Sequence, residues 1–178
     1  MEAKSKMLQS DCSFGGVSPL MLPFPYPPLK VQEPNQFYAN LLTVDYCGSV
    51  SELTAITQYI HGESCMCCDH CAQARTLIGI AMAEMIHLQK LGELILLLGG
   101  RIDYSVPTRS GKPQLWTPGY VEFAGSLSGI LSANIEAEKA AISQYEQHMK
   151  MIEDNCVNAV LSRIVQDEEY HIMLLRMM

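Results

Sequence analysis

Apolar residues recur at helical spacing in four stretches of the chain, and these stretches predict its secondary structure. The first covers residues 35–62, and Gly48 interrupts it, which predicts a kink. The second covers residues 71–98, the third about residues 118–153, and the fourth about residues 158–178. No stretch shows the two-residue alternation of a strand. The pattern therefore predicts an all-α protein.

The connections between the four predicted helices differ in length. Residues 99–118 form the longest internal connection, because they hold glycine, proline and polar residues without any apolar periodicity. The other two connections, between residues 62 and 71 and between about residues 153 and 158, are short. Short, long, short is the order expected of two helical hairpins joined by one crossover, so we expect a four-helix bundle.

Residues 1–34 differ in composition from the rest of the chain. They contain two adjacent glycines and six prolines: Gly15, Gly16, Pro19, Pro23, Pro25, Pro27, Pro28 and Pro34. This composition excludes a regular helix, so we predict an extended N-terminal arm over residues 1–34 and a bundle over residues 35–178. The arm would wrap either a neighbouring subunit or its own bundle. Because an extended arm has little to pack on in a lone bundle, we expect a homo-oligomer.

Composition and charge narrow the classes of function. The chain has 178 residues, of which 48% are hydrophobic and 17% charged, as in one well-buried globular domain. A net charge of -7 and a pI near 5.1 argue against a nucleic-acid or acidic-lipid partner. The N-terminal lysines precede no apolar run, so neither a signal peptide nor a membrane span is expected. The seven cysteines, an odd number, favour a reducing cytoplasm.

A nine-residue stretch occurs twice in the chain. SELTAITQY at residues 51–59 returns as AEKAAISQY at residues 137–145, and each copy carries a glutamate near its start, Glu52 and Glu138. Taken alone, each glutamate would most often be a solvated charge on a helix. Here, however, apolar residues share its face in both copies, which favours a glutamate that points into the bundle.

A second motif, Glu-x-x-His, also occurs twice. It appears as Glu84 with His87 and as Glu168 with His171, at an offset of 84 residues, against 86 for the lone glutamates. Whole hairpins are therefore duplicated. Residues i and i+3 share one helix face, so each pair can point into the bundle together.

The two motifs together supply four carboxylates and two imidazoles. A single Glu-x-x-His is common in helices, but two matching hairpins favour a paired-metal site, in which carboxylates bridge two cations about 3.5–4 Å apart and each histidine completes one of them. Two divalent cations would neutralise carboxylates that otherwise repel one another inside an apolar bundle. Oxygen and imidazole ligands suit iron or manganese, and the spacing does not choose between them.

Three further residues are candidates to support this site. Tyr59 and Tyr145 lie two turns beyond their glutamates, and each could donate its hydroxyl to a carboxylate of the facing helix. The alternative is an ordinary core tyrosine. Asp167 could accept the free N–H of a ligand histidine and so select its tautomer; the alternative is a surface aspartate.

Four thiols lie within seven residues, at Cys65, Cys67, Cys68 and Cys71. They could bind zinc, copper or an iron–sulfur cluster, and Cys68-x-x-Cys71 could form a redox dithiol. We favour the plainer interpretation, a tolerated loop composition. The other three cysteines are expected to be isolated apolar fillers: Cys12, Cys47 and Cys156.

The six candidate ligands resemble the ligand set of the ferritin-like superfamily, above all that of rubrerythrin-type diiron proteins and manganese catalases. They are Glu52, Glu84, His87, Glu138, Glu168 and His171. The resemblance implies a ferritin-like bundle with two iron or two manganese ions per chain, and a redox centre that reacts with peroxide or dioxygen. The proline-rich arm is similar to leaders of manganese catalases and related spore-coat proteins.

The chain also departs from the rubrerythrin pattern. A further carboxylate that rubrerythrins carry falls here on Ala141, and their rubredoxin module with two Cys-x-x-Cys knuckles is absent. The electron donor is therefore unidentified, and a catalase-like or oxidase-like activity stays open. Two alternatives from other classes also stay open: a ferroxidase or iron-handling protein, and a structural coat-type protein that keeps the metal site for stability.

Overall fold

The computed structural model describes residue 12, residues 15–108 and residues 110–178. Within them the elements are α1 (Gln36–Cys47), α2 (Glu52–Met66), α3 (Cys71–Leu97), β1 (Ser105–Val106), β2 (Gln114–Leu115), the 3-10 helix η2 (Pro118–Tyr120), α4 (Leu127–Met151) and α5 (Asn155–Arg176). The prediction of a ferritin-like helical bundle is confirmed.

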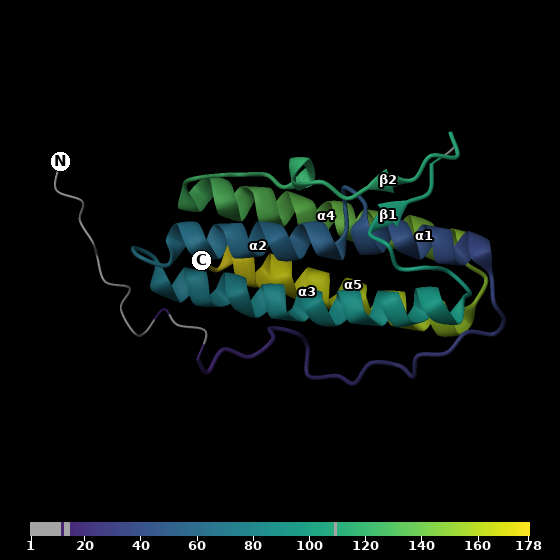
Figure 1. Cartoon of the computed structure of the whole chain (residues 1–178). Helices are drawn as coiled ribbons and strands as arrows, with labels where there is room; N and C mark the ends of the chain where they lie inside the picture. The colour runs from purple at the N-terminus through teal and green to yellow at the C-terminus, as the bar shows by residue number, and fades with distance from the viewer. Residues whose placement is uncertain (1–11, 13–14, 109) are drawn as a thin grey trace.

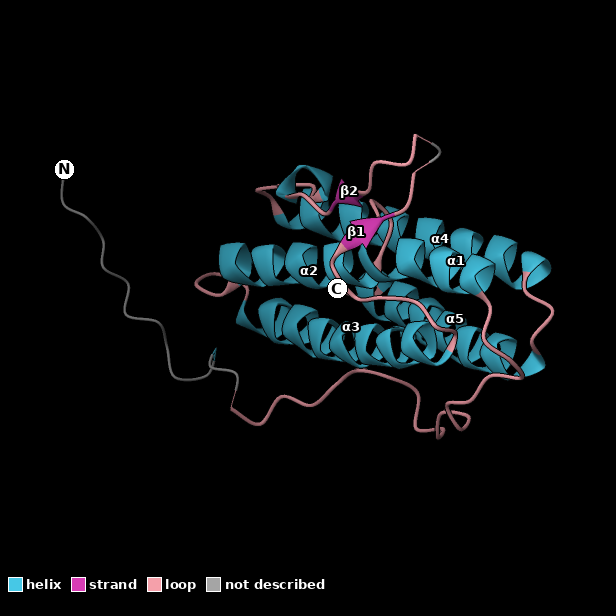
Figure 2. Ribbon diagram, turned by 45° about the vertical axis from the view of Figure 1, so that its right-hand side comes forward, coloured by secondary structure: helices cyan, strands magenta, loops and turns pink. Residues whose placement is uncertain are grey.

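Two helical hairpins make up the bundle (Figures 1 and 2). In the first, α1 and α2 lie nearly end to end and α3 runs back beside them. The second consists of α4 and α5. The crossover after α3 starts at one end of the bundle and returns along it to the other end, where α4 begins (Figure 1). The two motif-bearing halves of the chain therefore face each other.

The structure differs from the sequence-based prediction in two helices and in the crossover. The stretch 35–62 is two helices rather than one kinked helix, since residues 48–51 break it. The third bundle helix begins at Leu127 and not near residue 118, because Pro118–Tyr120 forms only a 3-10 turn and Ser126 caps the helix at Gly129 N. The crossover also contains an antiparallel β1–β2 pair, whose two-residue strands are too short to show alternation.

Two hydrophobic clusters fill the interior. One lies toward the α1 end and includes Leu42, Leu94 and Leu161; the other lies toward the opposite end and includes Leu77 and Ile130. Each cluster takes residues from both hairpins, so burial of apolar area holds the hairpins together at both ends. The layer between the clusters contains the predicted ligands.

The described part of the N-terminal arm, residue 12 and residues 15–34, packs on its own bundle; residues 1–11, 13 and 14 of the predicted arm lie outside the described residues. It follows α3 in Figure 1, and Leu20 N donates to Gly79 O at 2.9 Å. Farther along, the Arg163 guanidinium of α5 donates to Leu22 O at 2.8 Å, and Gln32 N donates to Asp154 at 2.6 Å. Of the two arrangements considered for the arm, the structure has the one on its own bundle. The arm therefore needs no second copy of the chain to pack on.

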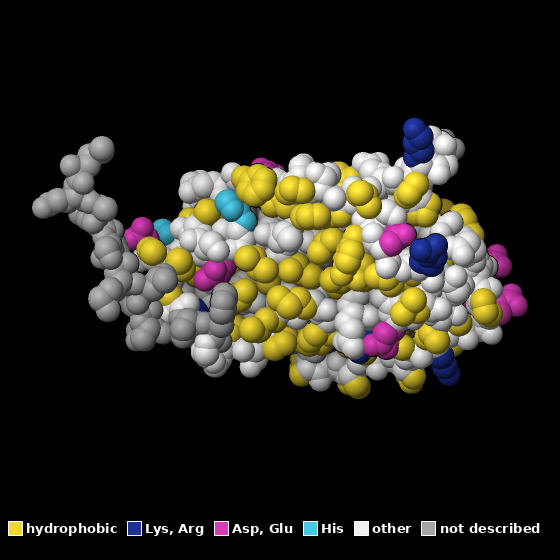
Figure 3. Space-filling model, in the orientation of Figure 1, with side chains coloured by type: hydrophobic (Ala, Val, Ile, Leu, Met, Phe, Trp, Pro, Cys, Tyr) yellow, Lys and Arg dark blue, Asp and Glu magenta, His cyan; other side chains and the backbone are white. Residues whose placement is uncertain are grey.

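Hydrophobic side chains gather on the face that α2 and α3 present in Figure 3. Ile60 of α2, and Met85 and Leu96 of α3, are among the exposed large hydrophobic residues. An apolar face of this kind is typical of a surface that binds another protein.

No helix among the described residues is long and apolar enough to cross a membrane.

The start of α2 yields a stability prediction. Ser51 Oγ accepts from Thr54 N at 3.2 Å and donates to Gly48 O at 2.8 Å, so it caps the helix that begins at Glu52. We expect Ser51→Ala to lower the free energy of unfolding by about 1 kcal/mol, because the Thr54 amide then loses its acceptor. Denaturant unfolding measures the change. Ser51→Thr should retain most of the stability, and equal losses in both variants would contradict a capping role.

Candidate metal centre

The six predicted ligands meet in the middle layer of the bundle. Glu52 begins α2, Glu138 lies midway along α4, and each Glu-x-x-His pair lies on α3 or α5. All six side chains are buried, with exposed fractions of 0–3%. Helical spacing explains the arrangement, because residues i and i+3 of α3 and α5 face the same side.

Their ligand atoms form two overlapping groups of four. The atoms within each group lie within 4.8 Å of one another. The first group is Glu52, Glu84, His87 and Glu168; the second is Glu84, Glu138, Glu168 and His171. Glu84 and Glu168 belong to both groups, so they are placed to bridge two cations. Each remaining glutamate, together with one histidine, belongs to a single position.

Both imidazoles turn Nδ1 toward the carboxylates. His87 Nδ1 lies 2.8 Å from Glu84 Oε2 and 3.3 Å from Glu168 Oε1. His171 Nδ1 lies 3.0 Å from an oxygen of each of the same two glutamates. A nitrogen lone pair directed at the carboxylate group is the orientation that a metal ligand needs.

The outward nitrogens have acceptors of their own. His87 Nε2 lies 3.3 Å from Asp167 Oδ2, and His171 Nε2 lies 2.8 Å from Leu20 O of the arm. A carbonyl or carboxylate oxygen can only accept, so each Nε2 keeps its proton when a cation binds at Nδ1. Burial acts to lower the pKa of both imidazoles, but the facing carboxylates outweigh burial and raise the pKa well above its usual value, so Nδ1 also carries a proton until a cation replaces it. Asp167 lies within hydrogen-bond distance of the outward nitrogen of His87.

The two repeat tyrosines cross between the hairpins. The Tyr59 hydroxyl of α2 donates to Glu138 of α4, and the Tyr145 hydroxyl of α4 donates to Glu52 of α2. Burial, together with the neighbouring carboxylates, raises the pKa of both tyrosines well above its usual value. Each tyrosine therefore stays a neutral donor that holds one carboxylate in place.

Asp167 is held by more partners than the sequence indicated. Leu22 N donates to it at 2.8 Å, the Tyr26 hydroxyl at 2.7 Å, and Arg163 lies 2.7 Å away. Burial alone would raise the pKa of Asp167, but these donors and His87 outweigh burial and lower the pKa to about 2. The sequence carried one signal for this network, since Arg163 lies at i−4 from Asp167. The arm residues carried none.

The carboxylates do not share one charge state. Burial, and then the charges of Glu84 and Glu168, raise the pKa of Glu52 well above its usual value and that of Glu138 to about 8. Burial also acts to raise the pKa of Glu84, but the two imidazoles hold it well below its usual value. The centre thus keeps protons where its negative charge is not balanced.

Two divalent cations fit this donor set. With both imidazoles neutral, they would match the four carboxylate charges without any retained proton. Glu84 Oε1 is buried and makes no well-aligned hydrogen bond within the described residues, and it lies 3.0 Å from His171 Nδ1, a ligand atom of the second group. A buried acceptor left in this way is consistent with a role as a metal ligand.

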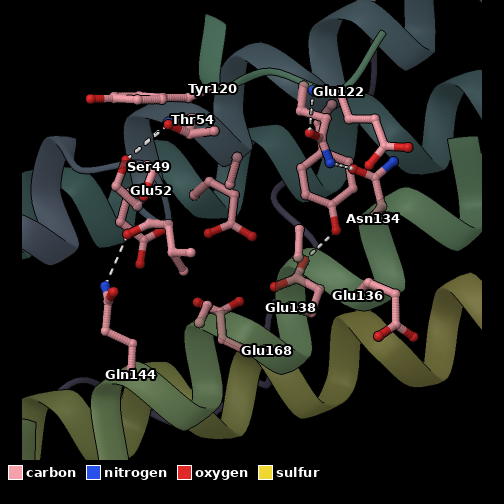
Figure 4. Close-up of a pocket in the computed structure, with 18 of the residues that line it drawn as sticks. Ser49, Glu52, Thr54, Tyr120, Glu122, Asn134, Glu136, Glu138, Gln144 and Glu168 are labelled. Carbon is pink, nitrogen blue, oxygen red and sulfur yellow. Dashed lines mark hydrogen bonds between the residues drawn. The ribbon is translucent and has the colours of Figure 1, made fainter. Parts of the chain in front are cut away.

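A cavity of about 190 Å³ adjoins the centre (Figure 4). Residues of α2 and α4 form most of its walls, with Tyr120 and Glu122 from the crossover. Glu52, Glu84, Glu138 and Glu168, the four carboxylates of the centre, also line it. The cavity thus connects the carboxylates to the side of the bundle where the crossover lies.

Two glutamines of the repeat also line this cavity, a role that the sequence reasoning missed. Gln58 donates to Asn134 at 3.0 Å and accepts from Glu122 N at 3.0 Å. Gln144 donates to Asp45 at 2.8 Å and to Val50 O at 2.9 Å. Each glutamine holds a neighbouring segment by its hydrogen bonds. The recurrence of both glutamines at the same place in the repeat was the signal from which this role could have been predicted.

The cysteine predictions need two corrections. Cys71 forms a disulfide with Cys12, so Cys12 is not isolated and Cys68-x-x-Cys71 is not a dithiol. The arm returns along α3 and brings these two residues together, which local spacing does not reveal. Cys67 Sγ lies 3.9 Å from Cys68 Sγ, while Cys65 Sγ lies 3.6 Å from His61. Within the described residues, no group of ligand atoms that could hold a metal includes a cysteine.

Comparison with known proteins relates this chain to one family. A family model described as a ferritin-like domain matches residues 51–177. A probable manganese catalase from Clostridium acetobutylicum is 29% identical over 167 residues, which cover 83% of this chain and 72% of the relative.

Two solved structures share the fold. KatB, a manganese catalase from Anabaena, has a TM-score of 0.74 at 24% identity and covers 86% of this chain and 76% of its own. The bacterioferritin BfrA from Mycobacterium tuberculosis has a TM-score of 0.64 at 23% identity, with coverage of 82% and 86%. At these identities the likeness concerns the fold alone.

The raised carboxylate pKa values predict that metal binding releases protons near neutral pH. A pKa of about 8 keeps Glu138 protonated at pH 7, and a cation binds only its carboxylate form. Metal affinity should therefore increase with pH through the neutral range, because Glu52, His87 and His171, whose pKa values are also raised, must lose protons as well. Calorimetric titration in buffers of different ionisation heat measures the release. Binding heat that does not depend on the buffer at pH 7 would contradict the prediction.

Proposed function

Because this chain belongs to the ferritin-like family, we propose that its buried centre holds two metal ions and that the protein is an oxidoreductase acting on hydrogen peroxide. The reaction proposed is disproportionation, in which two molecules of peroxide become two of water and one of dioxygen. One peroxide is oxidised while the other is reduced, so the reaction needs no separate electron donor.

One observation carries the proposal: two overlapping groups of ligand atoms share Glu84 and Glu168 in the buried middle layer. Such sharing is the arrangement by which two cations sit side by side. The relative from Clostridium acetobutylicum, named a probable manganese catalase, supports peroxide as the substrate and manganese as the metal.

The bound metal ions would supply the redox steps, and the protein would supply binding and orientation. Glu84 and Glu168 would bridge the pair. Glu52 with His87 would complete one position, and Glu138 with His171 the other. The hydroxyls of Tyr59 and Tyr145 would keep the two outer carboxylates in a fixed orientation.

The cavity beside the centre is the proposed entry for peroxide. Its volume of about 190 Å³ suits a small substrate, and all four of the candidate ligand carboxylates line it. Ala141 also lines it. The small Ala141 side chain leaves room beside the centre where a carboxylate would stand in rubrerythrins.

Two features of the whole protein stay proposals. We expect a homo-oligomer, in which the apolar face over α2 and α3 binds a second copy, because such a face is costly to leave in water. Size-exclusion chromatography with light scattering tests this. We also expect a cytoplasmic location, since five cysteines are free, Cys47, Cys65, Cys67, Cys68 and Cys156, against the single disulfide Cys12–Cys71, which alone favours an oxidising compartment.

The first test is the metal content of protein purified without added metal, followed by oxygen release from hydrogen peroxide on the same sample. About two manganese ions per chain with rapid oxygen release are expected, because the donor set holds two cations and the relative from Clostridium acetobutylicum is named a probable manganese catalase. Two iron ions with peroxide loss only when a reductant is present would favour a peroxidase instead. Rapid oxidation of added ferrous iron in a very large assembly would favour the iron-handling alternative. Intact protein without metal would overturn all of these.

A pair of variants on α4 tests the ligand assignment. Glu138 is buried, while Glu146, eight residues later on the same helix, is exposed and does not line the cavity. We expect Glu138→Gln to reduce oxygen release on the order of 100-fold and to lower the metal content, since it removes a charged ligand. Glu146→Gln is the matched control and should leave both unchanged. Equal effects of the two substitutions would contradict the assignment.

A further inference from the structure

The two imidazoles of the centre differ in the group that accepts a hydrogen bond from Nε2. The Glu-x-x-His motifs are offset by 84 residues, so Ala83 is the counterpart of Asp167. Asp167 accepts from His87 Nε2, but Ala83, which is fully buried, has no group that could do the same for His171. The internal repeat therefore leaves one imidazole without a carboxylate partner.

The N-terminal arm supplies the missing acceptor. The carbonyl oxygen of Leu20 lies 2.8 Å from His171 Nε2. The amide of the same residue, Leu20 N, donates to Gly79 O of α3 at 2.9 Å. This hydrogen bond fixes the position of the Leu20 backbone against α3.

A glycine on α3 permits this close approach. A Cβ atom added at Gly79 would lie 2.8 Å from Leu20 Cγ and 3.3 Å from Ser18 O. The first distance is shorter than carbon atoms tolerate, so any larger residue at Gly79 would push the arm away. Glycine is otherwise unfavourable inside a helix, by about 1 kcal/mol relative to alanine. Its presence here is explained by the arm.

The arm reaches the other imidazole as well, through Asp167. Leu22 N and the Tyr26 hydroxyl both donate to that carboxylate. The same short segment therefore contacts one imidazole directly and the other through its acceptor.

On the basis of the proposed metal centre, we infer that the N-terminal arm is part of the metal site. The Leu20 carbonyl is the positioning group for His171, and Asp167 is the positioning group for His87. The ligand His171 thus donates to a neutral carbonyl, whereas the ligand His87 donates to a carboxylate. The two metal ions are therefore bound with unequal affinity, although the six ligands are arranged nearly symmetrically.

The physical reason lies in the imidazole N–H. An acceptor at Nε2 fixes the ring orientation and raises the basicity of Nδ1, and loss of such a partner typically lowers metal affinity by about 10–100-fold. A charged acceptor strengthens the bond more than a neutral one, but Asp167 shares its charge with Arg163 at 2.7 Å. Because Arg163 of α5 also holds Asp167, displacement of the arm at Leu20 should weaken the His171 position more than the His87 position.

The test uses cobalt(II) as a spectroscopic probe on the full-length protein. Cobalt titration followed by absorbance gives the two affinities, and proton NMR of the loaded protein shows one exchangeable, hyperfine-shifted N–H signal for each bound imidazole. In Gly79→Val we expect one of two N–H signals to exchange fast with water and one affinity to fall about 10–100-fold. Asp167→Asn should instead affect the other signal.

Gly92→Val is the matched control. Gly92 lies on the same helix, but a Cβ there would meet Tyr46 at 3.3 Å and not the arm. This variant reports the cost of a β-branched residue in α3 and should keep both signals and both affinities. Unchanged binding in Gly79→Val, or equal weakening of both positions, would overturn the inference while the proposed function stood. Wild-type protein that binds fewer than two cobalt ions would overturn the proposed function, and this inference with it.

Discussion

Four carboxylates buried in one layer of an apolar bundle are the constraint on which the rest of this structure depends. Each carries a large desolvation cost, and each raises the cost of its neighbours. The protein meets this cost with two imidazoles, two tyrosine hydroxyls and retained protons, and the proposed cations would replace those protons. The hydrophobic clusters on either side of the layer hold the four helices in the register that these contacts need.

The duplication of the hairpin explains why the contacts come in pairs. Tyr59 and Tyr145 each cross to the glutamate of the other half, and Gln58 and Gln144 each tether a neighbouring segment. A pair of crossed contacts favours one docking of the hairpins over a shifted one, because a shift along the axis would break both at once. The repeat in the sequence thus encodes the association of the halves as well as the ligands.

The sequence predicted what depends on periodicity and missed what depends on the backbone. The ligands and tyrosines follow from helical spacing and from the repeat, so their convergence could be predicted. The break before Glu52 and the late start of α4 depend on single caps, Ser51 and Ser126, which a pattern of apolar residues does not locate. The Leu20 contact could not be predicted, because a backbone carbonyl leaves no mark in the sequence.

The arm and the cavity lie on different sides of the centre, and this division separates two tasks. The cavity reaches the carboxylates mainly between α2 and α4, whereas the arm follows α3 and contacts α5. The outward imidazole nitrogens point to the arm side, where Leu20 and Asp167 hold their protons. A small substrate entering through the cavity would meet the carboxylate face of the centre and not these protons. The arm can therefore fix the histidine tautomers without closing the way in.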